Sequence, residues 1–321
     1  MNAKRILTLK KKQIDYLDPD VAYFLGLITA RGQISEVGGV KRIVIEFPFR
    51  NLEVEGVKKR ICQRDQILLS LRKVISRVNE LADVNTREEE REHAIYLILE
   101  TMKNSLFWRN INMLMNYKTS YYEFEIPQQI FEADEATKKE FLRGFADVAG
   151  SARFSNRNRW GRCRIYLDVL NANWHLPVQI CHLLQDHLKI PVDTIAWGHP
   201  NIRDPNLREY KKGRKDAWAR EHQIKVFAEH FEKIGFYMSH KQEILKELAN
   251  YNRKKGFKRI AFCNPPKRLT RKTKPKHPSE KSRKLPPELR GKHYNSYWQI
   301  CADLGCWRYA EFMKKQKKLE T

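Results

Sequence analysis

Apolar and polar positions follow two periods along this chain, and the order of the periods is repeated in its two halves. The run Arg42-Ile-Val-Ile-Glu-Phe47 has the alternation of a half-buried strand, and Gly38-Gly39 before it predicts a hairpin turn. Residues 66–81 instead place apolar side chains every three or four positions, from Ile67 to Val78, which predicts an amphipathic helix. The first half therefore contains a β-hairpin followed by a helix.

The same reading predicts the order αββαββα in each half, and hence an α+β fold built as a pseudo-two-fold pair of subdomains. After a first helix that ends near residue 31, the expected elements are strands 33–36 and 41–50, helix 66–81, strands near 84 and at 93–100, and helix 105–115. After a second helix that ends near residue 149, they are strands 151–157 and 163–170, helix 176–188, strands 192–197 and 219–225, and helix 226–248 with a break near 235.

The first helix of each half carries the same nine-residue stretch. It reads Phe24-Leu-Gly-Leu-Ile-Thr-Ala-Arg-Gly32 in one half and, 118 residues later, Leu142-Arg-Gly-Phe-Ala-Asp-Val-Ala-Gly150 in the other. Asp18-Pro19 predicts the start of the first helix, and the capping-box spacing Thr137-Lys-Lys-Glu140 predicts that of the second. Glycine inside each stretch lets two helices approach closely, and the glycine that ends each stretch predicts a left-handed C-cap.

Both stretches resemble the helix motif of LAGLIDADG homing endonucleases, and the resemblance covers about residues 13–255. It implies that the two motif helices pack side by side and that the two sheets form a saddle over double-stranded DNA. It also implies a metal-binding acid at the eighth motif position, where this chain has Arg31 and Ala149. Mg²⁺ prefers oxygen ligands, so an arginine and an alanine do not hold it. The usual cutting site is therefore expected to be missing.

Cleavage by an altered site stays open at this point. Asp147 occupies the sixth motif position and Glu36 lies in the first hairpin, so either could hold Mg²⁺ in a relocated site. Lys103 and Lys225 precede the closing helices, in the region where the resemblance implies a catalytic lysine. Without such a site we expect neither a metal ion nor another cofactor, and the sequence favours a protein that is not an enzyme.

Charge agrees with a polyanionic partner, because the chain has 62 Lys and Arg against 38 Asp and Glu, a formal net charge of +24. Residues 251–321 hold 21 of these cations and only 5 of the acids. We therefore divide the chain into a first subdomain (1–118), a second subdomain (119–255), a basic linker rich in proline and lysine (256–291) and a helical hairpin (292–321). The hairpin could dock on the main domain or on a protein partner.

Basic residues of the predicted strands and of the loop 200–216 are the candidates for DNA contact. Arg31 joins them because it ends the first motif helix. The full set is Arg31, Lys41, Arg42, Arg50, Arg153, Arg157, Arg159, Arg162, Arg164, Arg203, Arg208, Lys211, Lys212 and Arg214. Polar strand candidates are Gln33, Ser35, Glu46, Ser155, His199 and Asn201.

The leading interpretation is a sequence-specific protein that binds double-stranded DNA on a catalytically degenerate LAGLIDADG scaffold. An intron maturase that binds structured RNA and an endonuclease with a relocated metal site are the alternatives. A zinc site from Cys263, His293, Cys301 and Cys306 is weaker, because the chain has no pair of cysteines two residues apart. The sequence has no apolar run of membrane length and its six cysteines form no disulfide pattern. We therefore expect a cytoplasmic or other intracellular protein, nucleoid-associated or organellar.

Overall fold

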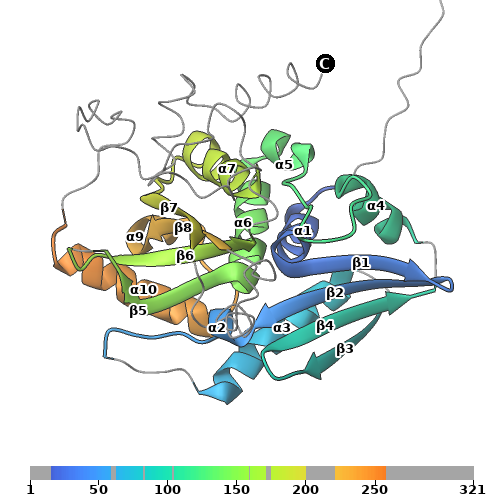
Figure 1. Cartoon of the computed structure of the whole chain (residues 1–321), viewed down its shortest axis with the longest axis horizontal. Helices are drawn as coiled ribbons and strands as arrows, with labels where there is room; N and C mark the ends of the chain where they lie inside the picture. Colours follow the sequence, from blue (N-terminus) through green and yellow to red (C-terminus); the bar gives the residue numbers. More distant parts are fainter. Residues whose placement is uncertain are drawn as a thin grey trace, which may run out of the picture.

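Two four-stranded antiparallel sheets and their helices form two similar halves around a central pair of helices in a computed structural model (Figure 1). The structure describes residues 16–58, 63–81, 84–102, 105–158, 160–170, 175–199 and 221–257. The predicted αββαββα order is present in both halves, so the predicted fold class is confirmed. Two short helices that the sequence reading did not predict, α2 and α5, connect the repeated elements.

The elements of the first half follow the predicted order closely. They are α1 (Pro19–Arg31), β1 (Gly32–Val37), β2 (Val40–Pro48), α2 (Phe49–Leu52), α3 (Arg64–Leu81), β3 (Asn85–Glu90), β4 (Ala94–Thr101) and α4 (Leu106–Leu114). Those of the second half are α5 (Gln128–Glu132), α6 (Glu135–Ala149), β5 (Gly150–Arg157), β6 (Cys163–Leu170), α7 (His175–His182), a π-helical turn (Leu183–His187), β7 (Thr194–His199), β8 (Glu221–Phe227), α9 (Ala228–Phe231) and α10 (Ser239–Lys254).

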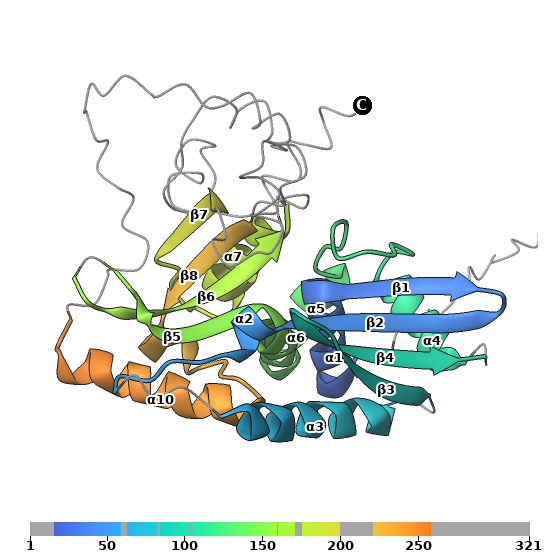
Figure 2. The same cartoon turned by 60° about the horizontal axis from the view of Figure 1, so that its bottom comes forward.

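Each sheet has the same strand order, β1-β2-β4-β3 in the first half and β5-β6-β8-β7 in the second. The register matches as well, since Gly32 pairs with Ile45 and Gly150 pairs with Leu167. Figure 2 shows α3 and α10 on one side of the two sheets. In Figure 1 the hairpins β1–β2 and β5–β6 extend to opposite ends of the longest axis. The molecule thus presents a long, two-part sheet surface.

The two motif helices, α1 and α6, pack with their backbones almost in contact, as the glycine repeat predicts. A Cβ atom on Gly26 would lie 2.1 Å from the carbonyl oxygen of Phe141, and one on Gly144 would lie 2.0 Å from that of Tyr23. Real side chains do not reach such distances, so these glycines permit the approach. The contact joins the halves, and its surroundings (Tyr23, Phe24, Phe141 and Phe145) are fully buried.

One of the two predicted helix starts is confirmed and the other is wrong. The Asp18 carboxylate accepts a hydrogen bond from the Val21 amide at 2.8 Å, and Pro19 opens α1. The second helix begins at Glu135, because Asp134 accepts from the Thr137 amide at 2.7 Å. Asp134 stands three residues ahead of the threonine that we expected to be the cap. Asp134 is therefore the N-cap, because its carboxylate reaches the free amide of Thr137 in the first turn.

The prediction of left-handed C-caps is also wrong. Gly32 has φ −93° and Gly150 has φ −83°, both extended, and the chain passes from each helix directly into a strand. Glycine is required at these two positions for a different reason, because a side chain would collide with the backbone. A Cβ on Gly32 would lie 2.6 Å from the Ile28 carbonyl oxygen, and one on Gly150 would lie 2.3 Å from that of Ala146. A helix that turns immediately into a strand leaves no space for a side chain there.

Connecting segments cover the inner edge of each sheet. Ile34 of β1 donates its amide to the Thr119 carbonyl at 2.8 Å, and Phe154 of β5 donates to the Glu55 carbonyl at 2.8 Å. Covered edges do not pair with foreign strands. No helix among the described residues is both long and apolar enough to cross a membrane.

Candidate nucleic-acid interface

Side chains alternate between two rows along the strands of the first sheet. Ile43, Ile45 and Phe47 form the inner row of β2 and are buried, whereas Arg42 on the opposite face is exposed. The register extends this outer row across the sheet, because Arg42 pairs with Glu100, Val44 with Ile98 and Glu46 with Tyr96. The outer row therefore lies on the face away from the core, and its exposed members form the surface that a partner would meet. Its members are Gln33, Ser35, Arg42, Val44, Glu46, Asn85, Arg87, Glu89, Tyr96, Ile98 and Glu100.

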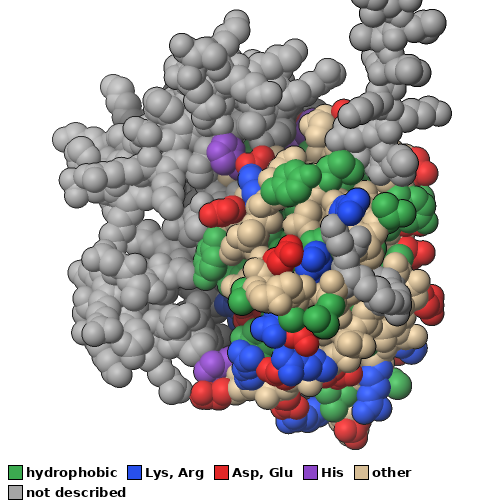
Figure 3. Space-filling view, turned by 90° about the vertical axis from the view of Figure 1, so that its right-hand side faces the viewer, with side chains coloured by type: hydrophobic (Ala, Val, Ile, Leu, Met, Phe, Trp, Pro, Cys, Tyr) green, Lys and Arg blue, Asp and Glu red, His purple; other side chains and the backbone are tan. Residues whose placement is uncertain are grey.

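The cations of this outer row are paired with carboxylates of the same row. Arg42 lies 2.5 Å from Glu100, and Arg87 lies 3.4 Å from Glu89 and 3.8 Å from Glu100. Lys41 is on the inner row, 92% buried, with its ammonium 2.9 Å from Glu36. Glu36 is thus committed to an ion pair. Viewed from the end of the first sheet, acidic and basic side chains are interspersed (Figure 3).

The outer row of the second sheet is built around an arginine, a tyrosine and a lysine. The Arg164 guanidinium lies 3.0 Å from Asp193 and donates to the Tyr166 hydroxyl at 3.0 Å. Lys225, which pairs with Tyr166 across β6 and β8, places its ammonium 4.6 Å from the centre of the Tyr166 ring. Burial and the nearby Arg164 lower the pKa of Lys225 to about 8. This cluster thus places two cations next to the Asp193 carboxylate.

The charge of the strands differs between the halves as a whole. Strands β1 to β4 contain three Lys and Arg against six Asp and Glu, whereas β5 to β8 contain four against two. The strands of the second sheet thus carry the more positive formal charge.

Two further arginine candidates of the second half are held inside the protein. Arg153 is 91% buried, donates to the Arg50 carbonyl at 2.8 Å and lies 2.9 Å from Glu53. Arg162 is 96% buried, and its guanidinium is bound by Glu229 and stacked over Phe227 at 3.7 Å. Both arginines tie segments of the fold together. Arg157 differs, because it is exposed at the end of β5 with its guanidinium over the Phe154 ring.

A cation lies at the C-terminal end of each motif helix. In the first half it is Arg31 itself, 95% buried, with its guanidinium 5.7 Å from the centre of the Tyr121 ring. In the second half, where Ala149 has no polar group, the cation comes from α10. The Lys241 ammonium donates to the carbonyl oxygens of Asp147 at 2.7 Å and Gly150 at 2.9 Å. Carbonyls at a helix end carry partial negative charge, which each cation offsets.

Asp147 is enclosed between the halves and accepts three hydrogen bonds. The donors are the Tyr23 hydroxyl at 2.7 Å and the backbone amides of Tyr237 at 3.2 Å and Met238 at 3.3 Å. The residue is fully buried, and burial raises the pKa of its carboxyl to about 6. Burial also lowers the pKa of the neighbouring Lys241 to about 8. The lone pairs that a metal ion would need are thus engaged within the protein.

Sequence reading missed Lys241, Asn51 and Asp168, which surround the end of α6. The Asn51 side-chain amide donates to the Ala149 carbonyl at 3.1 Å and to the Asp168 carboxylate at 3.0 Å. Lys241 had a signal that could have revealed it: it stands in the same helical stripe as the buried residues Leu245 and Leu248. Asn51 and Asp168 had no such signal, because their partners are about a hundred residues away.

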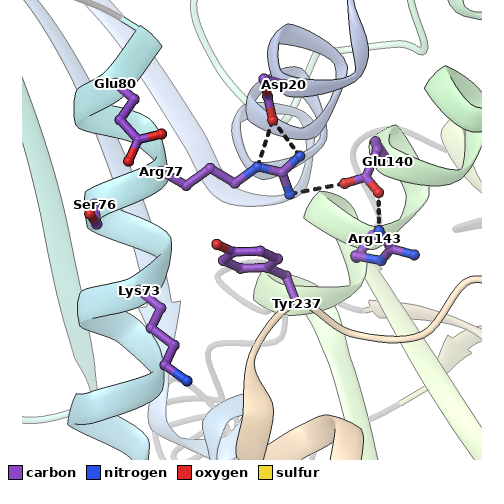
Figure 4. A pocket seen from close by; sticks show the side chains of 8 residues that line it. All are labelled: Asp20, Lys73, Ser76, Arg77, Glu80, Glu140, Arg143 and Tyr237. Carbon is purple, nitrogen blue, oxygen red and sulfur yellow. Dashed lines mark hydrogen bonds and ion pairs between the residues drawn. The ribbon is translucent and has the colours of Figure 1, made fainter.

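Behind the helix pair, Arg77 of α3 clamps both motif helices together in a charged pocket (Figure 4). Its guanidinium binds Asp20 of α1 at 2.6 and 2.8 Å and Glu140 of α6 at 2.9 Å. The same group stacks over the rings of Tyr23 at 4.1 Å and Tyr237 at 4.8 Å. The pocket is therefore lined by a network of complementary charges that holds the halves together.

Several candidates lie outside the described residues. They are Lys103, Arg159, Asn201, Arg203, Arg208, Lys211, Lys212, Arg214, and the possible zinc ligands Cys263, His293, Cys301 and Cys306. Within the described ranges, no three His, Cys, Asp or Glu side chains are grouped to hold a metal ion.

No family model and no curated protein matches the sequence. Solved structures similar to the chain include full-length DUF199/WhiA from Thermatoga maritima, with 15% identity over 78% of this chain and 64% of that one, and a TM-score of 0.40. The N-terminal LAGLIDADG domain of DUF199/WhiA has 12% identity over 77% of this chain and 87% of its own, with a TM-score of 0.35. The homing endonuclease I-DmoI in complex with DNA and manganese has 16% identity over 69% and 97%, with a TM-score of 0.36.

The chain thus spans just under two thirds of full-length WhiA. The LAGLIDADG resemblance read from the motifs recurs among these structures. The function of the chain has to be inferred from its own side chains.

Proposed function

We propose that this protein binds double-stranded DNA along its pair of sheets and does not cut it at the ends of the motif helices. The observation that carries the proposal is the cation at each of these ends, Arg31 and Lys241, beneath a sheet surface that extends to both ends of the molecule. A duplex is a long polyanion and fits a long sheet surface, whereas the two buried cations stand where cutting would need a metal-binding acid.

The net charge of +24 supports a nucleic-acid partner in general. Sheet geometry supports a duplex in particular, because a two-stranded β-ribbon fits the major groove of DNA. The β1–β2 and β5–β6 hairpins are two such ribbons, and they point in opposite directions from the helix pair (Figure 1). Contacts to base edges from Gln33, Ser35 and Arg42 in one half and from Arg164 in the other would give sequence preference, and the exposed Arg157 would contact a phosphate.

The proposed loss of cutting follows from what surrounds the end of α6. A metal ion there would stand beside the Lys241 ammonium, and its place is lined by an asparagine amide and an alanine. Two like charges in a site of low polarity repel strongly. Asp147, the acid that could have replaced the usual ligand, accepts hydrogen bonds from Tyr23 and two backbone amides. Neither motif helix then offers a carboxylate of its own to a metal ion, and the nearby Asp168 accepts a hydrogen bond from Asn51.

Selection of bound sequences from random duplex DNA, in buffer with EDTA, tests the proposal directly. We expect the full chain to enrich one sequence without a metal ion, and we expect plasmid that contains this sequence to stay supercoiled with Mg²⁺ or Mn²⁺. Metal-dependent double-strand cleavage that disappears in Asp147→Asn would instead support the relocated metal site.

A structured-RNA competitor in the same selection separates the maturase alternative. If RNA displaces the selected duplex at equal concentration, then the partner is RNA rather than DNA. Failure to enrich any duplex would contradict the proposal itself.

The C-terminal residues 264–321 are expected to add affinity without sequence preference. They are rich in lysine, arginine and proline, so they can follow phosphates but offer few groups for reading bases. Each phosphate contact contributes about 0.9 to the slope of log K against log salt. Deletion of residues 264–321 should therefore flatten the slope by several units in titrations with the selected and a scrambled duplex. Loss of the preference with an unchanged slope would show that this segment reads the sequence.

A further inference from the structure

The charged pocket behind the motif helices contains a stripe of polar side chains from α3. Lys73, Ser76, Arg77 and Glu80 are spaced by three or four positions, so they share one face of the helix. This face lines a cavity of about 480 Å³, to which α1, α6 and the segment before α10 also contribute (Figure 4). The cavity therefore lies at the junction of the two halves and is framed by side chains of both.

Arg77, in the middle of the stripe, is already neutralised within the protein. Its guanidinium is bound by Asp20 and Glu140, and Glu140 also binds Arg143. Arg143 in turn donates to the Ile234 carbonyl at 2.7 and 2.9 Å. These side chains carry two charges of each sign, so they form a balanced network that fixes the wall of the pocket.

Lys73 and Glu80 lie outside this network, one on each side of Arg77 in Figure 4. Both are exposed, and neither has an ion-pair or hydrogen-bond partner among the described residues. The pocket thus presents one uncompensated cation and one uncompensated anion. The two residues are seven positions apart on α3, which corresponds to about 10 Å along the helix axis.

Further polar atoms of the pocket accompany each of these two charges. Tyr237 lies on the Lys73 side of Arg77 with its hydroxyl toward α3, and no described group is hydrogen-bonded to that hydroxyl. On the Glu80 side, Asp20 accepts both of its hydrogen bonds from Arg77 through Oδ1, at 2.6 and 2.8 Å, which leaves Oδ2 without a described donor. The Lys73 end therefore offers donors to an anionic group, and the Glu80 end offers acceptors to a cationic group.

We propose that this pocket binds a short peptide of two or three residues, with its carboxylate at Lys73 and its ammonium at Glu80. An extended tripeptide is about 10 Å long, which matches the separation of the two charges. It carries one charge of each sign, as suits a pocket lined by three Asp or Glu and three Lys or Arg. Sites for small molecules usually enclose about 300–1,000 Å³. The inference does not depend on DNA binding and adds a second ligand, which would contact both halves at their junction.

Titration calorimetry of the full chain with trialanine at pH 7 tests the proposal. We expect trialanine to bind, and we expect N-acetylated trialanine and trialanine amide each to bind about tenfold more weakly, because each lacks one charged end. Glycine should not compete, because its two charges are adjacent and do not reach both ends of the pocket. Trialanine should also raise the midpoint of thermal unfolding, since a ligand of the folded state stabilises it.

Variants of α3 assign the two ends of the peptide. Lys73→Gln should weaken trialanine binding about tenfold and abolish the difference between trialanine and its amide. Glu80→Gln should abolish the difference between trialanine and its acetylated form. The matched control is Arg72→Gln, which removes an exposed cation of α3 outside the residues that line the pocket and should leave binding unchanged. All three side chains are exposed, so the variants should fold like the parent.

Three outcomes would overturn the proposal. Trialanine does not bind the parent, its capped forms bind as tightly as trialanine itself, or Arg72→Gln weakens binding as much as Lys73→Gln does. The last result would show that the peptide is attracted by surface charge and not held in the pocket.

Discussion

The two halves share one backbone and differ in what they place on it. The first sheet pairs its arginines with glutamates of the same face, as Arg42 does with Glu100, and its hairpin ends in two glycines. The second sheet has an excess of cations, and the turn of its hairpin is held by two hydrogen bonds to the Asn158 side chain. A repeated fold therefore fixes where a partner can lie, whereas the side chains decide which half holds it.

The ends of the motif helices show the same difference on a smaller scale. Arg31 belongs to the first motif itself, whereas the second motif receives its cation from Lys241, 92 positions after Ala149. Both solutions place a positive charge at the end of a helix. The second also buries an ammonium beside Asp147, so its stability depends on two groups that burial disfavours in their charged forms.

Lys241→Met should have the largest effect on folding. Lys241 and Asp147 are buried opposite charges that attract each other, and removing one of them costs about 3–5 kcal/mol because the other is left without compensation. Three carbonyl oxygens, those of Ala146, Asp147 and Gly150, also lose their donor. Denaturant unfolding at pH 7 measures the loss. Lys246→Met, on the exposed side of the same helix, is the matched control and should change stability little.

The effect of Lys241→Met should depend on pH. Burial raises the pKa of Asp147 to about 6, so its contribution to stability is present below its ordinary pKa and is lost as pH rises through the folded value. Without the ammonium that pKa rises further. The variant should therefore recover much of its stability between pH 7 and pH 5 relative to the parent. A deficit that is constant over this range would show that Asp147 and Lys241 are not coupled.

Gly26→Ala and Gly144→Ala should follow, with losses at or above the roughly 1–3 kcal/mol that overpacking usually costs. Each new Cβ would meet a backbone oxygen at about 2 Å, and a backbone does not yield as a side chain does. Because the contact is shared, the two variants should be destabilised alike in thermal unfolding. Gly39→Asn is the control, since its turn is open and asparagine tolerates positive φ. If the two variants lose unequal amounts of stability, then the two halves do not contribute equally to the contact between the motif helices.

Prediction from sequence succeeded where the information is local and repeated. The period of the apolar positions located both sheets and the covering helices, and the spacing of Gly26 and Gly144 predicted the contact between the motif helices. The errors at the helix ends, such as Asp134 in place of Thr137, are local choices between neighbouring caps. Patterns of this kind place elements well and their last residues poorly.

The site residues were harder to predict from the sequence, because the residues that bind them lie far away along the chain. Arg153 and Arg162 were selected as DNA contacts for their charge, but Glu53 and Glu229 bind them inside the fold. An ion pair across 67 or 100 positions leaves no periodic signal. Only Lys241, a lysine within an apolar stripe, broke a local rule visibly enough to be found from the sequence.

Arg157→Gln and Arg42→Gln compare the two sheets in solution and should give the smallest effects. Arg157 is exposed on the cationic half, so its loss should remove about one phosphate contact and flatten the salt slope of DNA binding by about 0.9. Arg42 already lies 2.5 Å from Glu100, and its loss releases a carboxylate as well as removing a cation. The salt slope of the Arg42→Gln variant should therefore change by less, although its DNA binding weakens through repulsion from the freed Glu100.

The double variant Arg42→Gln with Glu100→Gln should restore most of that affinity. If Arg42→Gln flattens the slope as much as Arg157→Gln does, then both sheets contact phosphates equally and the charge difference between the halves has no part in binding.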